Sequence, residues 1–352
     1  MEFQYRDKTI HCFAITPRTL DASEYWPNIK KTGEWCRNYG LTGPLLFNGN
    51  DTFVEVFVAA QTIVEQYDVA PLIAVNPLYM HPFTAAKMVS SYAYAFKKQV
   101  FLNMITGTAL SQAAALDCSL DHDEKYDRLL EYIEIIQLLT EKSPRPVSYE
   151  GKYYTIKDLA LPTEIPQDLQ PGFFIAGHSE GATKVRDATG AVGMKMLMPE
   201  LAGVVKEDKG IHFGVVCRET EEEAWEAANG KFPEDRRGKH MLEHSMKNTD
   251  SVWKKRLKFA ADTNDKCDNG YWLAPFRNFQ ADCPYFISSR EGLKNLIVDL
   301  TRAGVEEFIL DVPPDEKDFE EAGLAFKAAA EELAAAGEGR PVESSSDVVI
   351  PS

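Results

Sequence analysis

Short apolar runs alternate with amphipathic segments along most of the chain. Eight of these runs are predicted to be strands: residues 10–16, 44–47, 70–75, 99–106, 173–176, 191–197, 211–217 and 308–312. Continuous apolar strands that are separated by helices indicate a parallel sheet covered on both faces. Eight strands favour a closed barrel over an open sheet, so the pattern predicts an α/β fold, a (β/α)8 TIM barrel.

The amphipathic segments predict the helices of this barrel. They cover residues 25–39, 53–67, 82–96, 123–139, 180–187, 220–229, 292–302 and 318–335. Only 13 residues separate the sixth apolar run from the seventh, which is too few for a full barrel helix with its loops. We therefore expect a shortened helix after the sixth strand. Residues 147–156 alternate in polarity and predict a small antiparallel hairpin.

Interruptions of this rhythm divide the 352 residues into a main domain, which contains an insertion, and a C-terminal tail. Residues 1–335 are predicted to form a single barrel domain. Within it, residues 231–288 are long and irregular, which is typical of the lids that cover the C-terminal mouth of a barrel. Residues 336–352 are rich in Gly, Ser and Pro, and we expect a flexible tail there.

The formal net charge of −16 narrows the set of partners. It argues against a general nucleic-acid or anionic-membrane surface, because such surfaces need clustered cations. Six scattered cysteines include no C-x-x-C pair, and no group of His, Cys and Asp has the spacing of a metal site. We see neither a signal segment nor a run of about 18 apolar residues. We therefore expect a cytoplasmic protein with reduced thiols, no bound metal and no membrane span.

Polar residues near the strand ends are the first candidates for chemistry, because active sites of such barrels lie at the C-terminal ends of the strands. Asn76 and His81 follow the third strand. Asn103 and Thr106 belong to the end of the fourth strand, and His212 lies in the seventh. A histidine in an apolar strand is more often a satisfied core residue than a catalytic one, so both interpretations of His212 stay open.

The segment FFIAGHSEGA joins a strand to a helix through Gly177, His178 and Ser179. Ser179 is a good N-cap, and small residues here would let a phosphate approach the first N–H groups of the helix. A plain Ser-capped barrel helix explains the same residues, and on local sequence alone it is the more common case. No Gly-x-Gly-x-x-Gly or Walker A motif is present, which argues against dinucleotide and nucleoside-triphosphate sites.

A second candidate segment is LDHDEKY at residues 120–126. His122 and Tyr126 are one helical turn apart, so both could face the mouth of the barrel. The alternative is that His122 lies on the surface and Tyr126 packs against the core.

Together these segments resemble the luciferase-like flavin monooxygenases, most closely the alkanesulfonate monooxygenase branch. The similarity rests on residues 39–46 (YGLTGPLL), 82–88 (PFTAAKM), 103–107 (NMITG), 120–126 (LDHDEKY), 149–152 (YEGK), 174–182 (FIAGHSEGA) and 218–225 (RETEEEAW). Their order and spacing agree from about residue 10 to residue 228, and the joint match is more specific than any one motif.

The resemblance implies FMN as the cofactor, bound as FMNH2 and supplied by a separate NAD(P)H:flavin reductase, with O2 as co-substrate. Asn103 and Thr106 would line the isoalloxazine side. The phosphate would be held by His122, Tyr126, Gly177, His178 and Ser179. The Ala74–Val75 peptide would lie beside the flavin, where related barrels often carry a strained cis bond. A homo-oligomer, either a dimer or a tetramer, is usual among relatives.

Departures from the alkanesulfonate pattern concentrate on the substrate side. Thr52 stands where those enzymes carry a cysteine, and His212 and Gly214 stand where they carry Arg-x-His. Residues 279–286 (FQADCPYF) replace a glycine-rich mobile loop with its arginine, and Met196 replaces a tryptophan. We therefore expect a small organic substrate other than a simple alkanesulfonate, a change compatible with a role in specialised metabolism.

Four residues are candidates to contact the reacting centre: Asn76, His81, His212 and Arg277. His212 could shuttle a proton if its pKa lies near neutrality.

Three other functions fit parts of the sequence. An F420-dependent oxidoreductase on the same barrel would transfer hydride without O2, but the motifs of the sulfonate branch argue against it. A catalytically degenerate flavin-binding protein would explain the missing cations. The retained Asn103 and Thr106 argue against that protein and against a cofactor-free lyase or hydrolase.

Overall fold

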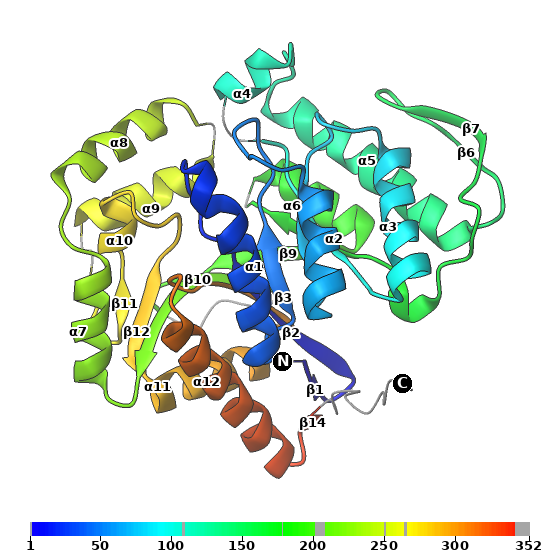
Figure 1. Ribbon diagram of the computed structural model, residues 1–352. Coiled ribbons are helices and arrows are strands. Elements are labelled where there is room, and N and C mark those ends of the chain that lie inside the picture. Colours follow the sequence, from blue (N-terminus) through cyan, green and yellow to red (C-terminus); the bar gives the residue numbers. More distant parts are fainter. Residues whose placement is uncertain are drawn as a thin grey trace.

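Eight parallel strands close into a barrel in the computed structural model, which describes residues 2–107, 110–177, 179–200, 208–249, 251–263 and 266–341 (Figure 1). They are β2 (Lys8–Ile15), β3 (Gly43–Leu46), β4 (Leu72–Val75), β5 (Phe101–Met104), β8 (Gly172–Ala176), β9 (Val192–Met196), β10 (Lys209–Arg218) and β13 (Glu307–Asp311). Each strand pairs in parallel with the next, and β13 pairs with both β10 and β2 to close the ring. The predicted (β/α)8 barrel is confirmed.

The helices expected from periodicity cover the outside of the barrel (Figure 1). They are α1 (Ala22–Asn38), α2 (Val56–Tyr67), α3 (Pro82–Phe96), α5 (His122–Lys142), α6 (Glu180–Thr189), α7 (Glu221–Lys231), α11 (Arg290–Arg302) and α12 (Glu316–Ala335). The hairpin is β6 (Val147–Glu150) paired with β7 (Thr155–Leu159). No helix lies at residues 197–200 or 208, and the rest of the connection after β9 falls outside the described residues.

Apolar side chains fill the lower part of the barrel lumen, which is the part nearer to the N-terminal ends of the strands. They form one buried cluster that includes Phe13, Leu45, Leu72, Phe101, Phe174, Met194 and Ile309. Side chains two positions apart on a strand point to the same side. Asn103 and Asp311 therefore face the lumen one layer above Phe101 and Ile309. His212 faces it as well, because its ladder partner Met196 lies two positions beyond Met194.

Residues 336–341 differ from the prediction of a flexible tail. Gly339–Pro341 form β14, which pairs antiparallel with β1 (Phe3–Tyr5) at the N-terminal end of the barrel. The ion pair between Arg302 and Glu338, at 2.8 Å, holds the approach to this strand. Backbone pairing with β1 offsets the conformational entropy that is lost when this Gly-containing segment becomes ordered. Residues 342–352 lie outside the described residues.

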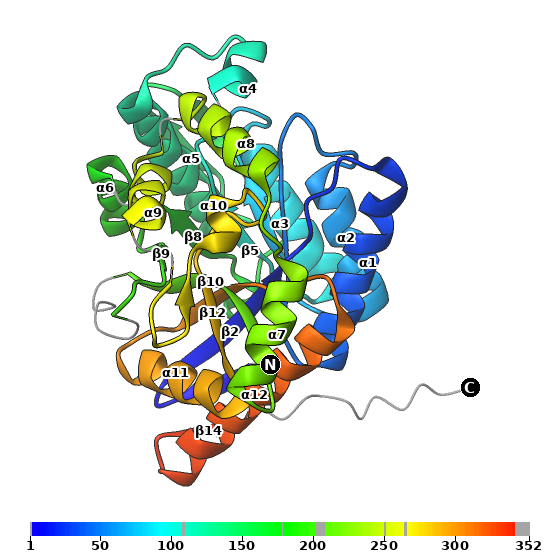
Figure 2. The same cartoon turned by 90° about the vertical axis from the view of Figure 1, so that its left-hand side faces the viewer.

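The expected lid segment contains α8 (Arg236–Lys247), α9 (Val252–Thr263), β11 (Tyr271–Trp272) and α10 (Ala274–Arg277). Figures 1 and 2 place α8 at the same end of the molecule as α4 (Leu110–Ala115), which follows the C-terminal end of β5. Asn248 at the end of α8 bonds to Ser111 of α4, with Nδ2 3.0 Å from the hydroxyl oxygen. The insertion therefore reaches the C-terminal mouth.

The sequence prediction missed a strand that extends the barrel sheet at the mouth. β12 (Tyr285–Ser289) pairs in parallel with the upper half of β10, while β13 pairs with the lower half. β10 is long enough for both neighbours, since it runs for ten residues. Residues 231–288 were expected to be irregular, and Tyr285–Ser289 instead form this strand.

Candidate active site at the barrel mouth

Two polar atoms in the upper layer of the lumen have no partner among the described residues. They are Oδ1 of Asn103, on β5, and Nε2 of His212, on β10. Both atoms are buried, and buried polar atoms of native proteins rarely lack a hydrogen bond. A ligand that supplies a donor or acceptor to each of them fits this layer.

The pKa of His212 is lowered to about 4. Burial is the main cause, and the positive charge of Arg18 acts in the same direction while the negative charge of Asp282 opposes them. The ring is partly exposed as a whole, but its Nε2 atom is buried. His212 is therefore neutral at pH 7, which contradicts the condition under which it was expected to shuttle a proton.

Asp311 ends β13 in the same layer, and its pKa is raised to about 6. Burial raises it most, and the negative charge of Asp282 adds to this effect. Hydrogen bonds from Tyr285 and Cys283 act in the opposite direction because they stabilise the carboxylate. The Cys283 Sγ atom lies 3.7 Å from Oδ2 of Asp311.

Tyr285 lies against Gly214, its register partner across the β10–β12 ladder. A Cβ atom at Gly214 would overlap the tyrosine ring, so only glycine admits this packing. The ring also contacts Phe232 edge-on, with centroids 4.7 Å apart. The space beside Gly214, where the alkanesulfonate pattern has the histidine of Arg-x-His, is thus occupied by an aromatic ring from β12.

Two cations at the mouth share one carboxylate. Arg18, in the loop after β2, lies 2.9 Å from Asp282, and Lys254 of α9 lies 3.1 Å from it. Although burial would raise the pKa of Asp282, the charges of Lys254 and Arg18 keep it below its usual value. The Arg18 guanidinium also stacks on the Phe47 ring at 4.2 Å. The insertion is therefore tied to the first barrel loop.

Asn76 and His81 both organise the loop after β4. Asn76 is buried and its Oδ1 accepts a hydrogen bond from the Leu78 N–H at 3.0 Å. Its amide nitrogen would lie 2.9 Å from a Cβ atom at Gly107, so the two loops touch. His81 is exposed and caps α3, with Nδ1 accepting from the Phe83 N–H at 3.2 Å.

Arg277, the last of the four reaction candidates, ends α10 in the insertion. Its guanidinium lies 4.0 Å from Glu234. The structure thus assigns His212 to the upper layer of the lumen, Asn76 to the β4 loop, and Arg277 to the insertion. His81 serves as a helix cap.

The predicted phosphate residues do converge where β8 meets α6. Ser179 caps α6, with its hydroxyl 3.2 Å from the Ala182 N–H. Gly177 has a φ of +136°, and a Cβ atom there would lie 2.8 Å from the Tyr126 hydroxyl. The His122 and Tyr126 rings stand 5.1 Å apart. His178 lies outside the described residues.

The predicted flavin-side residues also share one edge of the barrel. Ala74 is the register partner of Asn103, and the Ile105 N–H bonds to the Val75 carbonyl at 2.9 Å. Thr106 follows directly and is partly exposed. The Ala74–Val75 peptide is trans, since the one cis peptide among the described residues precedes Pro144.

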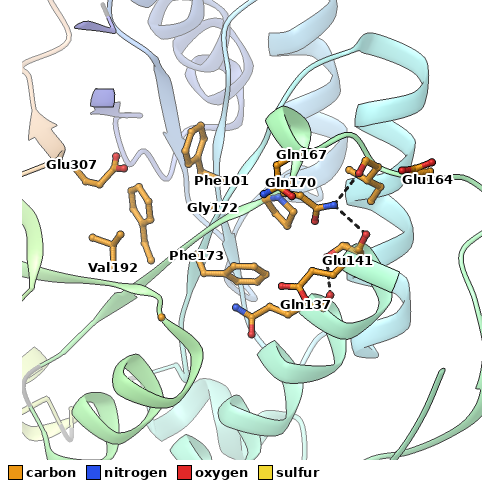
Figure 3. Close-up of a pocket in the computed structure, with 15 residues that line it drawn as sticks. Phe101, Gln137, Glu141, Glu164, Gln167, Gln170, Gly172, Phe173, Val192 and Glu307 are labelled. Carbon is orange, nitrogen blue, oxygen red and sulfur yellow. Dashed lines mark hydrogen bonds between the residues drawn. The ribbon is translucent and has the colours of Figure 1, made fainter. Parts of the chain in front are cut away.

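A hollow opens at the opposite end of the barrel. It has a volume of about 600 Å³ and is lined by the first residues of several strands, including Phe101, Gly172 and Glu307 (Figure 3). Figure 3 shows Gln170 bonded to two backbone carbonyls there. Barrel enzymes carry out their chemistry at the other end, so this hollow is not the candidate active site.

The residues that prediction missed are Asp282, Cys283, Tyr285 and Asp311. The polar position at the end of an inward-facing strand could have indicated Asp311. No local signal marks the other three, because they belong to the irregular insertion and to the strand that the sequence did not reveal.

Residues 71–307 match the luciferase-like monooxygenase family, and the chain belongs to that family. The protein is therefore an enzyme of the luciferase-like monooxygenase class. Among the helices described, none is long and apolar enough to cross a membrane, and the same residues contain no cluster of His, Cys, Asp and Glu suited to a metal ion.

Individual relatives are similar over most of their length. The 4-(gamma-L-glutamylamino)butanoyl-[BtrI acyl-carrier protein] monooxygenase BtrO of Niallia circulans is 27% identical over 307 residues, 84% of this chain and 89% of that protein. EDTA monooxygenase EmoA from Chelativorans sp. BNC1 has a similar fold, with a TM-score of 0.65, 14% identity, and 94% of each chain covered. The oxygenating constituent of 3,6-diketocamphane monooxygenase of Pseudomonas putida, in complex with FMN, has a TM-score of 0.64 and 14% identity, covering 92% of this chain and 98% of that one.

Proposed function

We propose that the protein is the oxygenase component of a two-component flavin monooxygenase. It would bind FMN in reduced form, FMNH2, from a separate NAD(P)H:flavin reductase and use O2 to oxygenate a small organic substrate. The observation that carries this proposal is the unpartnered, buried Oδ1 of Asn103 at the same end of the barrel as the Gly177–Ser179 turn. A flavin needs both features, one for its ring system and one for its phosphate.

The residues present fit FMN. The N-terminus of α6 offers free N–H groups to an anion, and its dipole favours negative charge there. Gly177 leaves room beside Tyr126 that any side chain would fill. Asn103 and neutral His212 can orient a polar ring edge in the lumen, and Asn76 and Thr106 frame the neighbouring loops.

Bound FMN supplies the electrons that activate O2. The chain orients the cofactor through Asn103 and the α6 turn, and its insertion limits the access of water to the mouth. The paired cations Arg18 and Lys254 are neutralised in part by Asp282, so the mouth differs from one built for a sulfonate. A homo-oligomer, either a dimer or a tetramer, is also proposed.

The first test is FMN fluorescence quenching by the purified protein under reducing anaerobic and oxidising aerobic conditions, with reduced F420 as a parallel titrant. We expect preferential binding of FMNH2, and Gly177→Ala should weaken it at least about tenfold, because the added Cβ closes the space beside Tyr126. Gly190→Ala is the matched control, since Gly190 also has a positive φ but nothing lies within 4 Å of its Cβ position.

Other outcomes would assign other functions. Binding of F420 alone would indicate an F420-dependent oxidoreductase that needs no O2. Binding of FMNH2 without oxygenation of any substrate would indicate a degenerate flavin-binding protein. If neither cofactor binds, both the FMNH2-dependent oxygenase and the F420-dependent oxidoreductase are excluded. The cofactor-free lyase or hydrolase then becomes the function to test.

The insertion favours a carrier-bound substrate. BtrO, by its name, acts on an acyl group attached to an acyl-carrier protein. In this chain of net charge −16, residues 236–263 contain eight Lys and Arg but three Asp and Glu. Met241 and Phe259, on α8 and α9, are 54% and 75% exposed. A basic surface with apolar side chains at the mouth suits an acidic carrier protein that delivers its substrate on a phosphopantetheine arm.

Charge reversal of this surface tests the carrier-bound substrate. The pairs Arg236→Glu with Arg237→Glu, and Lys255→Glu with Arg256→Glu, should each weaken binding of phosphopantetheinylated BtrI carrier protein about tenfold at low salt, measured by calorimetry. Lys30→Glu with Lys31→Glu on α1 is the matched control. Equal binding by all variants would exclude the carrier protein, and a loss of FMNH2 transfer alone would assign the surface to the reductase.

A further inference from the structure

Two carboxyl groups lie close together at the mouth in contrasting surroundings. Asp282 has two cations within 3.1 Å, Arg18 and Lys254, whereas Asp311 has hydrogen-bond donors but no ion pair among the described residues. Where surroundings push the pKa values of two such groups apart, the groups take different parts in acid–base chemistry. Asp282 stays ionised and structural, which leaves Asp311 as the group that can exchange a proton near neutral pH.

We propose that Asp311 is the general base of the barrel mouth. It takes a proton from the bound substrate, whose bonding electron pair stays on the substrate, and later releases that proton to water. The role rests on the proposed oxygenase function, since removal of a proton makes the substrate atom more reactive toward an oxidant.

The position of Asp311 fits this role. It is the last residue of β13, so it lies at the C-terminal rim where barrel enzymes carry catalytic groups. Its side chain keeps partial exposure, and its place in β13 turns it toward the lumen. Tyr285 and Cys283 bond to the carboxylate from β12 and the preceding loop, and they act as positioning residues that fix its orientation.

The groups that face Asp311 account for its proton affinity. Burial and the Asp282 carboxylate raise the pKa of Asp311 to about 6, and Tyr285, Cys283 and Arg18 limit the rise. A base is most effective when its pKa lies near the working pH. His212 cannot share the role, because its pKa is lowered to about 4.

A titration of the ligand-free protein tests the assignment without any activity. In protein labelled with [13C]aspartate at the carboxyl carbon, we expect one NMR signal that titrates near pH 6 and disappears in Asp311→Asn. Asp282→Asn should lower the pKa of that signal because it removes a neighbouring negative charge. Tyr285→Phe should raise it because the carboxylate loses a donor. A signal that still titrates near pH 6 in Asp311→Asn would overturn the assignment. Loss of the pH dependence of the signal in His212→Gln would overturn it as well.

The complete enzyme with FMNH2 supplies the second readout. Substrate oxygenation should increase as the pH rises through about 6, and Asp311→Asn should lose about a hundredfold in rate together with this pH dependence. Asp311→Glu should restore part of the rate. If FMNH2 does not bind but the NMR signal near pH 6 is present, the oxygenase proposal fails. The assignment of that titration to Asp311 is still valid in this case. If oxygenation proceeds and Asp311→Asn keeps the wild-type pH profile, the base is another residue.

Discussion

His212 and Asp311 illustrate how environment, more than residue type, decides what a side chain does in this barrel. Burial lowers the pKa of the histidine to about 4 and raises that of the aspartate to about 6. The two groups are therefore both uncharged over part of the acidic range. The sequence left both interpretations of His212 open and could not supply its pKa, because Arg18 and Asp282 come from distant segments.

Replacement of His212 should change the acid stability of the protein. The folded state binds fewer protons than the unfolded state between about pH 4 and pH 6.5, so neutral His212 contributes stability above 6.5 that is lost as the pH falls toward 4. His212→Gln should remove this loss and gain about 2–3 kcal/mol relative to wild type between pH 7.5 and pH 4.5. Urea unfolding at both pH values measures it. Exposed His81 offers a control, and an equal gain in His81→Gln would contradict the explanation.

Several site residues were predictable from the sequence because their geometry is local. His122 and Tyr126 are one turn apart on α5, and Ser179 caps the helix that follows Gly177. These pairs need only helix periodicity and capping preferences to be recognised. By contrast, Asp282 and Asp311 approach each other only after the insertion folds against the last strand.

At the scale of elements, the barrel strands and the β6–β7 hairpin were predicted, whereas the short strands β1, β11 (Tyr271–Trp272), β12 and β14 were not. The barrel strands are apolar runs that any buried parallel strand would show. β12 is five residues long and follows a loop that contains Pro284. It becomes a strand because the upper half of β10 offers an unpaired edge, and β14 forms because β1 offers another.

The β10–β12 packing predicts opposite effects of two glycine substitutions. Gly214→Ala should destabilise the protein by about 2 kcal/mol, because its Cβ would overlap the Tyr285 ring. Gly230→Ala in α7 should stabilise it by about 0.5–1 kcal/mol, because nothing lies within 4 Å of that Cβ and alanine favours a helix. Urea unfolding compares the two variants. A Gly214→Ala protein as stable as wild type would refute the proposed packing.

At the scale of the whole molecule, charge is distributed unevenly. The insertion is basic over residues 236–263, although the complete chain carries a net charge of −16. An acidic body repels anionic partners from most directions and leaves one attractive face at the mouth. The overall charge was available from composition, but its meaning depends on where the fold places α8 and α9.

The double pairing of β10 has a consequence for how the mouth can open. Its lower half belongs to the barrel wall and its upper half supports β12, so a single continuous strand joins wall and insertion. Movement of β12 would break its backbone hydrogen bonds to β10. This pairing therefore holds the base of the insertion against the barrel wall. We therefore expect any opening of the mouth to move α8 and α9 relative to the barrel wall and to leave β12 in place.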